Sequence, residues 1–138
     1  MKRAAVLIGL VLALVLSLRW TGRAQTTPPQ FTGKTENMDA KDVGVGRRSF
    51  EPGARTFWHS HEKGQLIFVE QGRGLVQRKS EAIKEMKPGD SDYTAPNVVH
   101  WHGAAPNERL VQIAIGFGGQ AKWLEAVTDA EYNARPRR

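Results

Sequence analysis

The segment GARTFWHSHEKGQLIFVEQG, residues 53–72, combines short runs of β-branched and aromatic residues with glycines at regular intervals. A second such segment is GDSDYTAPNVVHWHGAAPN, residues 89–107. The four histidines of the chain form two His-x-His pairs, at residues 59–61 and 100–102. Alternate residues of a strand point to the same face, so each pair presents two imidazoles on one side. Two such pairs in one small chain predict a metal site.

The same β pattern continues on both sides of these segments. Short runs rich in Val, Ile, Phe and Thr are separated by turns that contain Gly, Pro or Asn. We expect strands at 43–50, 54–61, 65–70, 73–79, 81–86, 90–94, 98–102 and 109–117. Many short strands with regular turns are typical of a sandwich or barrel, and a jelly roll closes its own edges. The sequence therefore predicts an all-β fold.

The pattern changes after Gly118-Gly119. Ala121, Leu124 and Val127 recur at a spacing of three, with Trp123 beside them, which favours a helix. The run TDAE, residues 128–131, has the form of a helix capping box, and a simple polar turn is the alternative. We therefore expect a short C-terminal helix.

The N-terminal region predicts export. Residues 1–24 combine a basic start, a 15-residue apolar run and a small-residue exit ending at Ala24. This pattern indicates a cleaved signal peptide and a periplasmic or secreted product that meets the membrane only during export. An uncleaved anchor is the alternative, although 15 helical residues span only about 22 Å. We expect a flexible arm at 25–42, a barrel domain at 43–132 and a basic tail at 133–138.

Most of the net positive charge of the chain lies in this predicted leader. The full sequence has 20 basic and 14 acidic residues, and four of the basic ones lie within residues 1–24. The remainder has a net charge of only +2. No basic stripe with interleaved aromatic residues is present, so nucleic acid is not an expected partner. The chain has no cysteine, so its core must fold without disulfides.

The spacing of the two histidine segments resembles the two conserved motifs of the cupin superfamily. The matching positions are Gly53, His59, His61, Gln65 and Gly72 in the first motif, and Gly89, Pro96, His100 and Asn107 in the second. The resemblance implies a single-domain cupin jelly-roll barrel, the double-stranded β-helix. It also implies that His59, His61 and His100 bind a metal, with Gln65 at the position of the usual acid. For Gln65, a surface strand position is the alternative.

The resemblance implies one divalent metal ion. Three imidazoles and one oxygen suit Mn, Fe, Co, Ni or Zn, and affinity order alone does not select among them. A neutral amide in place of a carboxylate leaves the ion with its full double charge, which strengthens it as a Lewis acid.

A narrower resemblance is carried by residues 50–56, 100–104 and 123–129 together with Gln65. These stretches are similar to a bacterial cupin subgroup that includes manganese-dependent hydroxynitrile lyases and proteins associated with carboxymuconolactone decarboxylases. In the lyases, the metal and neighbouring histidines deprotonate a cyanohydrin, which releases an aldehyde and cyanide. The resemblance therefore favours manganese. A further histidine of the lyases aligns with Gln112, whose amide does not titrate and cannot act as a general base.

Four residues are candidates for contact with a substrate. His102 is a catalytic candidate, as a base beside the metal or as a substrate-orienting donor, and a structural histidine is the alternative. Arg48 would lie near the pocket and favour an anionic substrate if Phe50 points inward, with a solvent-facing position as the alternative. Gln112 is a candidate because it aligns with the further histidine of the lyases. Phe57 is either a substrate contact or part of the core.

Three classes of function remain open from the sequence. The leading hypothesis is a metal-dependent lyase or isomerase that acts on a small organic molecule by Lewis-acid activation, as in hydroxynitrile lyases. The second is an Fe-dependent dioxygenase of the quercetinase kind. The third is a non-catalytic module that binds a metal or small ligand. We expect a homodimer or higher homo-oligomer, and Trp58 and Trp101 are expected to pack in the core or at a dimer surface.

Overall fold

The computed structural model describes residues 31–134. The predicted leader, residues 1–24, lies outside the described residues, as does most of the predicted basic tail. The described part of the first compact unit, residues 31–38, has no helix or strand, and the second unit begins at Asp39. Within residues 31–134, no helix is long and apolar enough to cross a bilayer.

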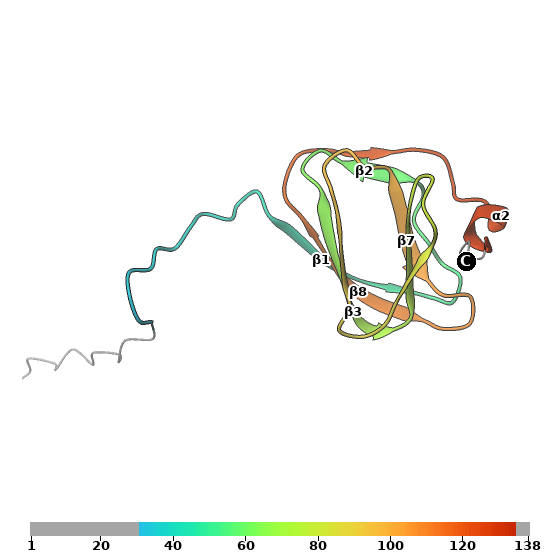
Figure 1. Ribbon diagram of the computed structural model, residues 1–138, viewed down its shortest axis with the longest axis horizontal. Coiled ribbons are helices and arrows are strands. Elements are labelled where there is room, and N and C mark those ends of the chain that lie inside the picture. The colour runs from blue at the N-terminus through green and yellow to red at the C-terminus, as the bar shows by residue number, and fades with distance from the viewer. Residues whose placement is uncertain (1–30, 135–138) are drawn as a thin grey trace, which may run out of the picture. The chain divides into compact units, whose positions relative to one another are not determined.

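The second unit contains two antiparallel sheets, which confirm the predicted all-β jelly roll (Figure 1). The first sheet has the strand order β1-β8-β3-β6, and the second has the order β5-β4-β7-β2-β9. The strands are β1 Gly44–Phe50, β2 His59–His61, β3 Gln65–Gly72, β4 Gly74–Arg78, β5 Lys84–Met86, β6 Ser91–Thr94, β7 His100–Ala104, β8 Leu110–Gly116 and β9 Ala121–Trp123. Strands far apart in sequence are neighbours, such as β1 and β8, so the barrel brings distant segments together.

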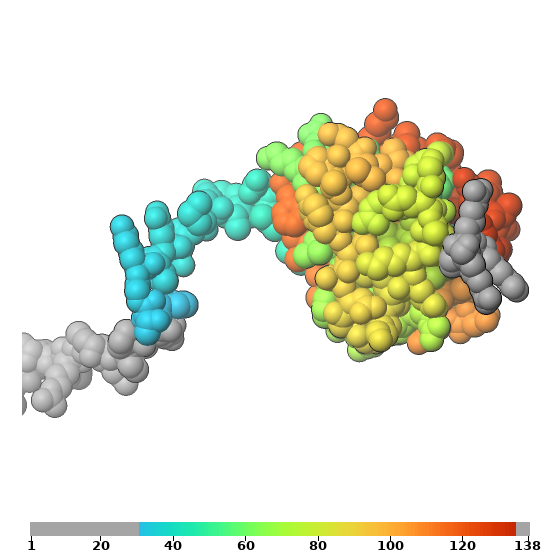
Figure 2. All heavy atoms as spheres, in the orientation of Figure 1, coloured from blue at the N-terminus to red at the C-terminus, as the bar shows by residue number. Residues whose placement is uncertain are grey.

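Apolar side chains from both sheets form one cluster of the buried core. The buried members of this cluster are Phe50, Ile67, Val69, Val76, Met86, Ala104 and Leu110. They come from six strands, so their burial holds the two sheets together through the hydrophobic effect. In Figure 2, the yellow-green and yellow segments from the middle of the chain pack closely over the face of the barrel that is in view.

A second apolar cluster lies on the other side of β7 and contains Trp58, Trp101, Val127 and Tyr132. Trp58 and Trp101 are almost fully buried within the chain, so the core alternative is confirmed and the dimer-surface alternative is wrong. The Tyr132 hydroxyl donates a hydrogen bond of 2.7 Å to the Ala104 carbonyl. This contact fastens the C-terminal segment to the barrel.

The C-terminal helix is shorter than expected. Helix α2 spans Asp129–Tyr132, and the predicted capping box is present: the Glu131 N–H donates to Thr128 Oγ1, and the Thr128 N–H donates to Glu131 Oε2. The helical interpretation of residues 121–127 is wrong. Ala121–Trp123 form strand β9, which pairs with β2 and satisfies the backbone groups on that edge. The spacing of Leu124 and Val127 instead reflects their packing against the second apolar cluster.

Candidate metal centre

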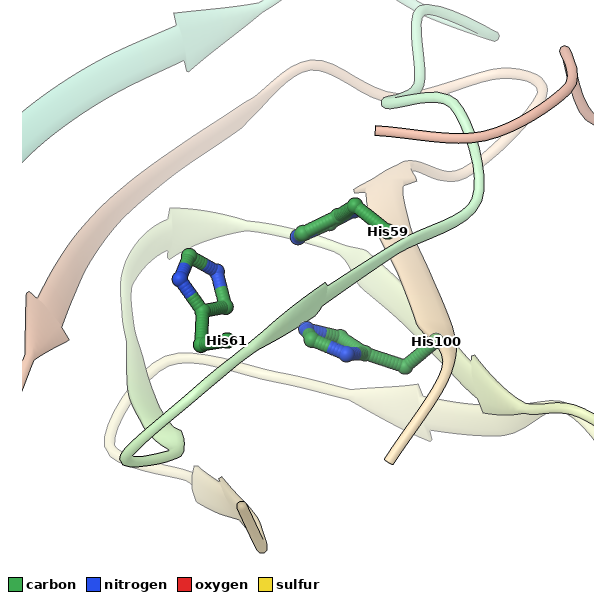
Figure 3. A group of neighbouring side chains, drawn as sticks. All are labelled: His59, His61 and His100. Atoms are coloured by element: carbon green, nitrogen blue, oxygen red, sulfur yellow. The ribbon is translucent and has the colours of Figure 1, made fainter. Parts of the chain in front are cut away.

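Three histidines from two strands converge inside the barrel (Figure 3). His59 and His61 point to the same side of β2, and His100 lies at the start of β7. The backbones of His59 and His100 are direct partners in the β2–β7 ladder, which brings the two predicted motifs into contact. One ring nitrogen of each histidine lies within 4.8 Å of the others, which is a suitable arrangement for one shared metal ion.

Backbone carbonyls determine which ring nitrogens face this common space. His59 Nδ1 lies 2.9 Å from the Phe57 carbonyl, and His100 Nδ1 lies 3.1 Å from the Val98 carbonyl. A carbonyl only accepts hydrogen bonds, so both Nδ1 atoms carry the proton and Nε2 keeps its lone pair. His61 also has a ring nitrogen available for a ligand, since its Nε2 is buried without a hydrogen-bond partner among the described residues. A metal ion would satisfy all three nitrogens.

Gln65 completes this group at the start of β3. Its side chain is buried, so the surface alternative for this residue is wrong. Gln65 Oε1 lies 3.0 Å from His100 Nε2. With the His100 proton on Nδ1, this contact joins two acceptors, and a cation that both could share would relieve it. The three imidazoles and the amide oxygen therefore fit a divalent metal.

The histidine rings are held in the neutral form. Burial lowers the pKa values of His59 and His61, and it lowers that of His100 to about 4, with the neighbouring His59 adding to the effect. Neutral imidazole is the form that binds metal ions, because protonation removes the lone pair. These nitrogens are therefore available to a metal at neutral pH.

His102 lies next to the three histidines but makes a different contact. It shares the inward face of β7 with His100, and the two rings stack with their centroids 6.0 Å apart. Its Nδ1 lies 3.1 Å from Gln112 Nε2, and the Gln112 side chain is almost fully buried. The amide nitrogen donates, so neutral His102 carries its proton on Nε2. Burial lowers the pKa of His102 well below its usual value, which also favours the neutral form.

A cavity of about 530 Å³ opens beside the histidines. The metal candidates His59, His61 and Gln65 line it, as do the other predicted site residues, His102, Arg48, Gln112 and Phe57. His100 belongs to the histidine cluster but does not line the cavity. The barrel thus brings the predicted residues together. Phe57 is 55% exposed, so the core alternative for it is wrong.

Trp123 also lines this cavity, and the sequence did not indicate it as a site residue. It is the direct partner of His59 in the β2–β9 ladder, and its ring stacks on the imidazole with centroids 4.7 Å apart. Its sequence neighbourhood resembled a helix, so the pairing of Trp123 with the first histidine segment had no local signal.

Comparison with known proteins places these residues in a family. The cupin domain family matches residues 46–116. An (R)-mandelonitrile lyase from Granulicella tundricola is 45% identical over 87 residues, which cover 61% of this chain and 66% of the relative, just under two thirds of its length.

Solved structures have the same fold. A cupin-like protein from Thermotoga maritima superposes with a TM-score of 0.65 and 48% sequence identity, covering 66% of this chain and 71% of the other. The polyketide cyclase RemF from Streptomyces resistomycificus has a TM-score of 0.53 and 15% identity, with 65% of each chain covered. At that identity, the second likeness concerns the fold alone.

Proposed function

This chain belongs to the cupin domain family, and from that premise we propose that it is a metal-dependent enzyme, a lyase or isomerase of a small organic molecule. The observation that carries the proposal is the convergence of His59, His61 and His100 within 4.8 Å beside a cavity of about 530 Å³. A structural metal alone would not need a cavity of this size beside it.

A divalent metal held by these histidines and Gln65 would supply Lewis-acid polarisation of a substrate oxygen. The chain itself supplies the remaining groups. His102, with its proton on Nε2, would donate a hydrogen bond to the substrate and orient it. Gln112 would hold His102 in that tautomer through the contact at Nδ1. Phe57 and Trp123 would exclude water from one side of the bound molecule.

We propose manganese as the metal, from the resemblance of the chain to manganese-dependent lyases and its 45% identity to the mandelonitrile lyase. The neutral ligand set supports Lewis-acid chemistry, because no ligand carboxylate would reduce the charge of the ion. Iron, zinc, nickel and cobalt fit the same donors.

The test is reconstitution of the purified protein with Mn(II), Fe(II) or Zn(II), followed by assay of mandelonitrile cleavage. We expect Mn-loaded protein to release benzaldehyde and cyanide faster than metal-free protein and faster than the His59→Ala variant. Oxygen consumption by the Fe(II) form alone would favour the dioxygenase alternative. Tight binding of ligand without turnover in any metal form would favour the binding module and contradict the proposal.

Gln112 allows a sharper test of the lyase relationship. Gln112→His introduces the titratable group that the hydroxynitrile lyases have at the aligned position. We expect cyanohydrin cleavage to rise by about tenfold or more, because a positioned general base accelerates proton transfer. Gln112→Asn is the matched control, since it keeps an amide and should give no increase.

Export and self-association are further parts of the proposal. The leader-like pattern of residues 1–24 supports a periplasmic or secreted location. Val43 and Val45 are exposed at the start of edge strand β1, which supports pairing with a second copy. Mass spectrometry of the protein from its own organism would locate the N-terminus, and analytical ultracentrifugation would give the oligomeric state.

A further inference from the structure

Three arginines lie around the cavity, and two of them are already bound by groups of the protein. Arg47 Nε donates to Glu70 Oε2 at 2.6 Å, and a second hydrogen bond makes this ion pair bidentate. Arg55 donates to Asp129 Oδ1 at 2.6 Å and to the Val127 carbonyl at 3.0 Å. The charge of each is balanced by a carboxylate.

Arg48 differs from both of these arginines. Among the described residues, its guanidinium has neither an ion-pair partner nor a hydrogen-bond partner. It alternates along β1 with Gly46 and Phe50, which also line the cavity, and Phe50 is buried against the His102 ring. Its backbone is directly opposite Gln112 in the β1–β8 ladder. Arg48 therefore lines the cavity while remaining exposed to solvent, and its five N–H donors remain available.

The formally charged side chains that line the cavity are all arginines. No aspartate or glutamate is among the described residues that line it. Imidazole and amide ligands are neutral when they bind a metal, so the double charge of a divalent ion would have no compensation from its ligands. Arg48 adds a third positive charge. A bound anion would balance the charge of an ion held by the buried histidines and could also pair with the exposed Arg48 guanidinium.

The remaining lining suits an apolar body attached to that anion. Phe57 is 55% exposed and Trp123 is 60% exposed, and both line the cavity. Exposed aromatic side chains beside a cavity mark a surface that a ligand covers. An aromatic or branched apolar group fits this side of the cavity.

We propose that the cavity binds a small organic anion with an apolar body, and that Arg48 holds its carboxylate. The guanidinium fork matches a planar carboxylate with two parallel hydrogen bonds. This inference rests on the proposed function for the metal, but it makes a separate claim about what the cavity selects. It assigns Arg48 as the residue that determines specificity, in contrast to Arg47 on the same strand.

The test is isothermal titration calorimetry of the Zn-loaded full chain with benzoate and with benzamide, which have the same shape and differ in charge. We expect wild type to bind benzoate at least about tenfold more tightly than benzamide. Arg48→Gln should weaken benzoate binding about tenfold and leave benzamide unchanged, and Arg48→Lys should fall between. Arg47→Gln is the matched control and should change benzoate binding less than about twofold.

Two results would overturn the inference. One is equal affinity of wild type for benzoate and benzamide, and the other is an equal loss of benzoate binding in Arg47→Gln and Arg48→Gln. Metal content is measured in every variant, and the titrations are repeated on metal-free protein. An Arg48-dependent preference for benzoate in a protein that turns over no substrate would support this inference while contradicting the proposed enzyme.

Discussion

The paired strands β2 and β7 face two different environments, one on the inner side of the barrel and one on the outer side. On the inner side, ring nitrogens of His59, His61 and His100 converge beside a cavity that His102 also lines. On the outer side, Trp58 and Trp101 pack edge to face, with centroids 6.5 Å apart, under Val127 and Tyr132. The outer cluster is closed by the C-terminal segment, whereas the inner cluster is open to a ligand.

Alternation along a strand thus separates stability from function by a single residue. In the sequence His100-Trp101-His102, the middle side chain belongs to an apolar core and its two neighbours belong to the site. Substitutions at adjacent positions should therefore produce different defects. Variants on each side of the strands can show whether stability and metal binding are separable.

The largest effect is expected from removal of an inner ligand. His59→Ala and His100→Ala should each abolish metal binding, because two imidazoles no longer hold the ion tightly. Elemental analysis should then find no bound metal, whereas wild type should bind one ion per chain. The stabilisation by metal should disappear as well; at a metal concentration 100 times Kd it amounts to about 2.7 kcal/mol. Unchanged metal stoichiometry in both variants would falsify the site.

On the outer side, Trp101→Ala should destabilise the fold without removing the metal ligands. The indole is fully buried and its Nε1 donates to Gln77 Oε1 at 2.8 Å. We expect the free energy of unfolding to fall by about 3–5 kcal/mol, measured by urea denaturation of metal-free protein. Trp123→Ala is the control, because that ring is 60% exposed and should cost less than about 1 kcal/mol. Similar losses for the two variants would contradict the separation.

On the inner side, His102→Ala should lower activity without lowering metal content. The ring neighbours His100 but bonds to Gln112, so the variant should keep its full metal content. Activity with the metal-loaded protein should fall by about 10- to 100-fold, because a positioned hydrogen-bond donor is lost. Steady-state kinetics with parallel elemental analysis provides the measurement. Full activity in this variant would remove His102 from the mechanism.

The smallest effect is expected at the end of the outer cluster. Thr128→Ala removes the side-chain cap of helix α2, which carries Tyr132 into the cluster. We expect a loss of about 1 kcal/mol in the free energy of unfolding, with metal content unchanged. Thr128→Ser keeps the capping oxygen and should restore most of the stability. A loss of metal from Thr128→Ala would show that the two sides are coupled.

The sequence predicted most of the inner side because its signals are local. The alternation of the two His-x-His pairs and the spacing of their glycines are visible over a few residues. Most strands lie close to the expected positions, but of the expected strands 54–61 and 81–86 only His59–His61 and Lys84–Met86 are formed. Gln65 came from its position in the motif resemblance, and Arg48 came from its alternation with Phe50 along one strand. The neutral character of Gln112 was predicted, but its hydrogen bond to His102 depends on the distance between β7 and β8, which no local pattern encodes.

The parts that the sequence did not predict depend on pairing between distant segments. Residues 121–127 have a helix-like spacing, but the free edge of β2 binds Ala121–Trp123 as a strand. The same pairing places Trp123 on His59. The neutralisation of Arg47 by Glu70 also needs two strands to be brought together. Tertiary contacts overrule local propensity at these places.

The stacking of Trp123 on His59 gives the protein an optical reporter for a metal at the proposed site. The indole lies with its centroid 4.7 Å from that of a proposed ligand ring, whereas Trp58 and Trp101 face the outer cluster. Open-shell ions such as Mn(II), Fe(II) or Co(II) quench a nearby indole, and closed-shell Zn(II) does not. A fall in the tryptophan fluorescence of the unlabelled chain should therefore reveal loading with an open-shell ion, and Zn(II) at the same concentration should cause no such fall.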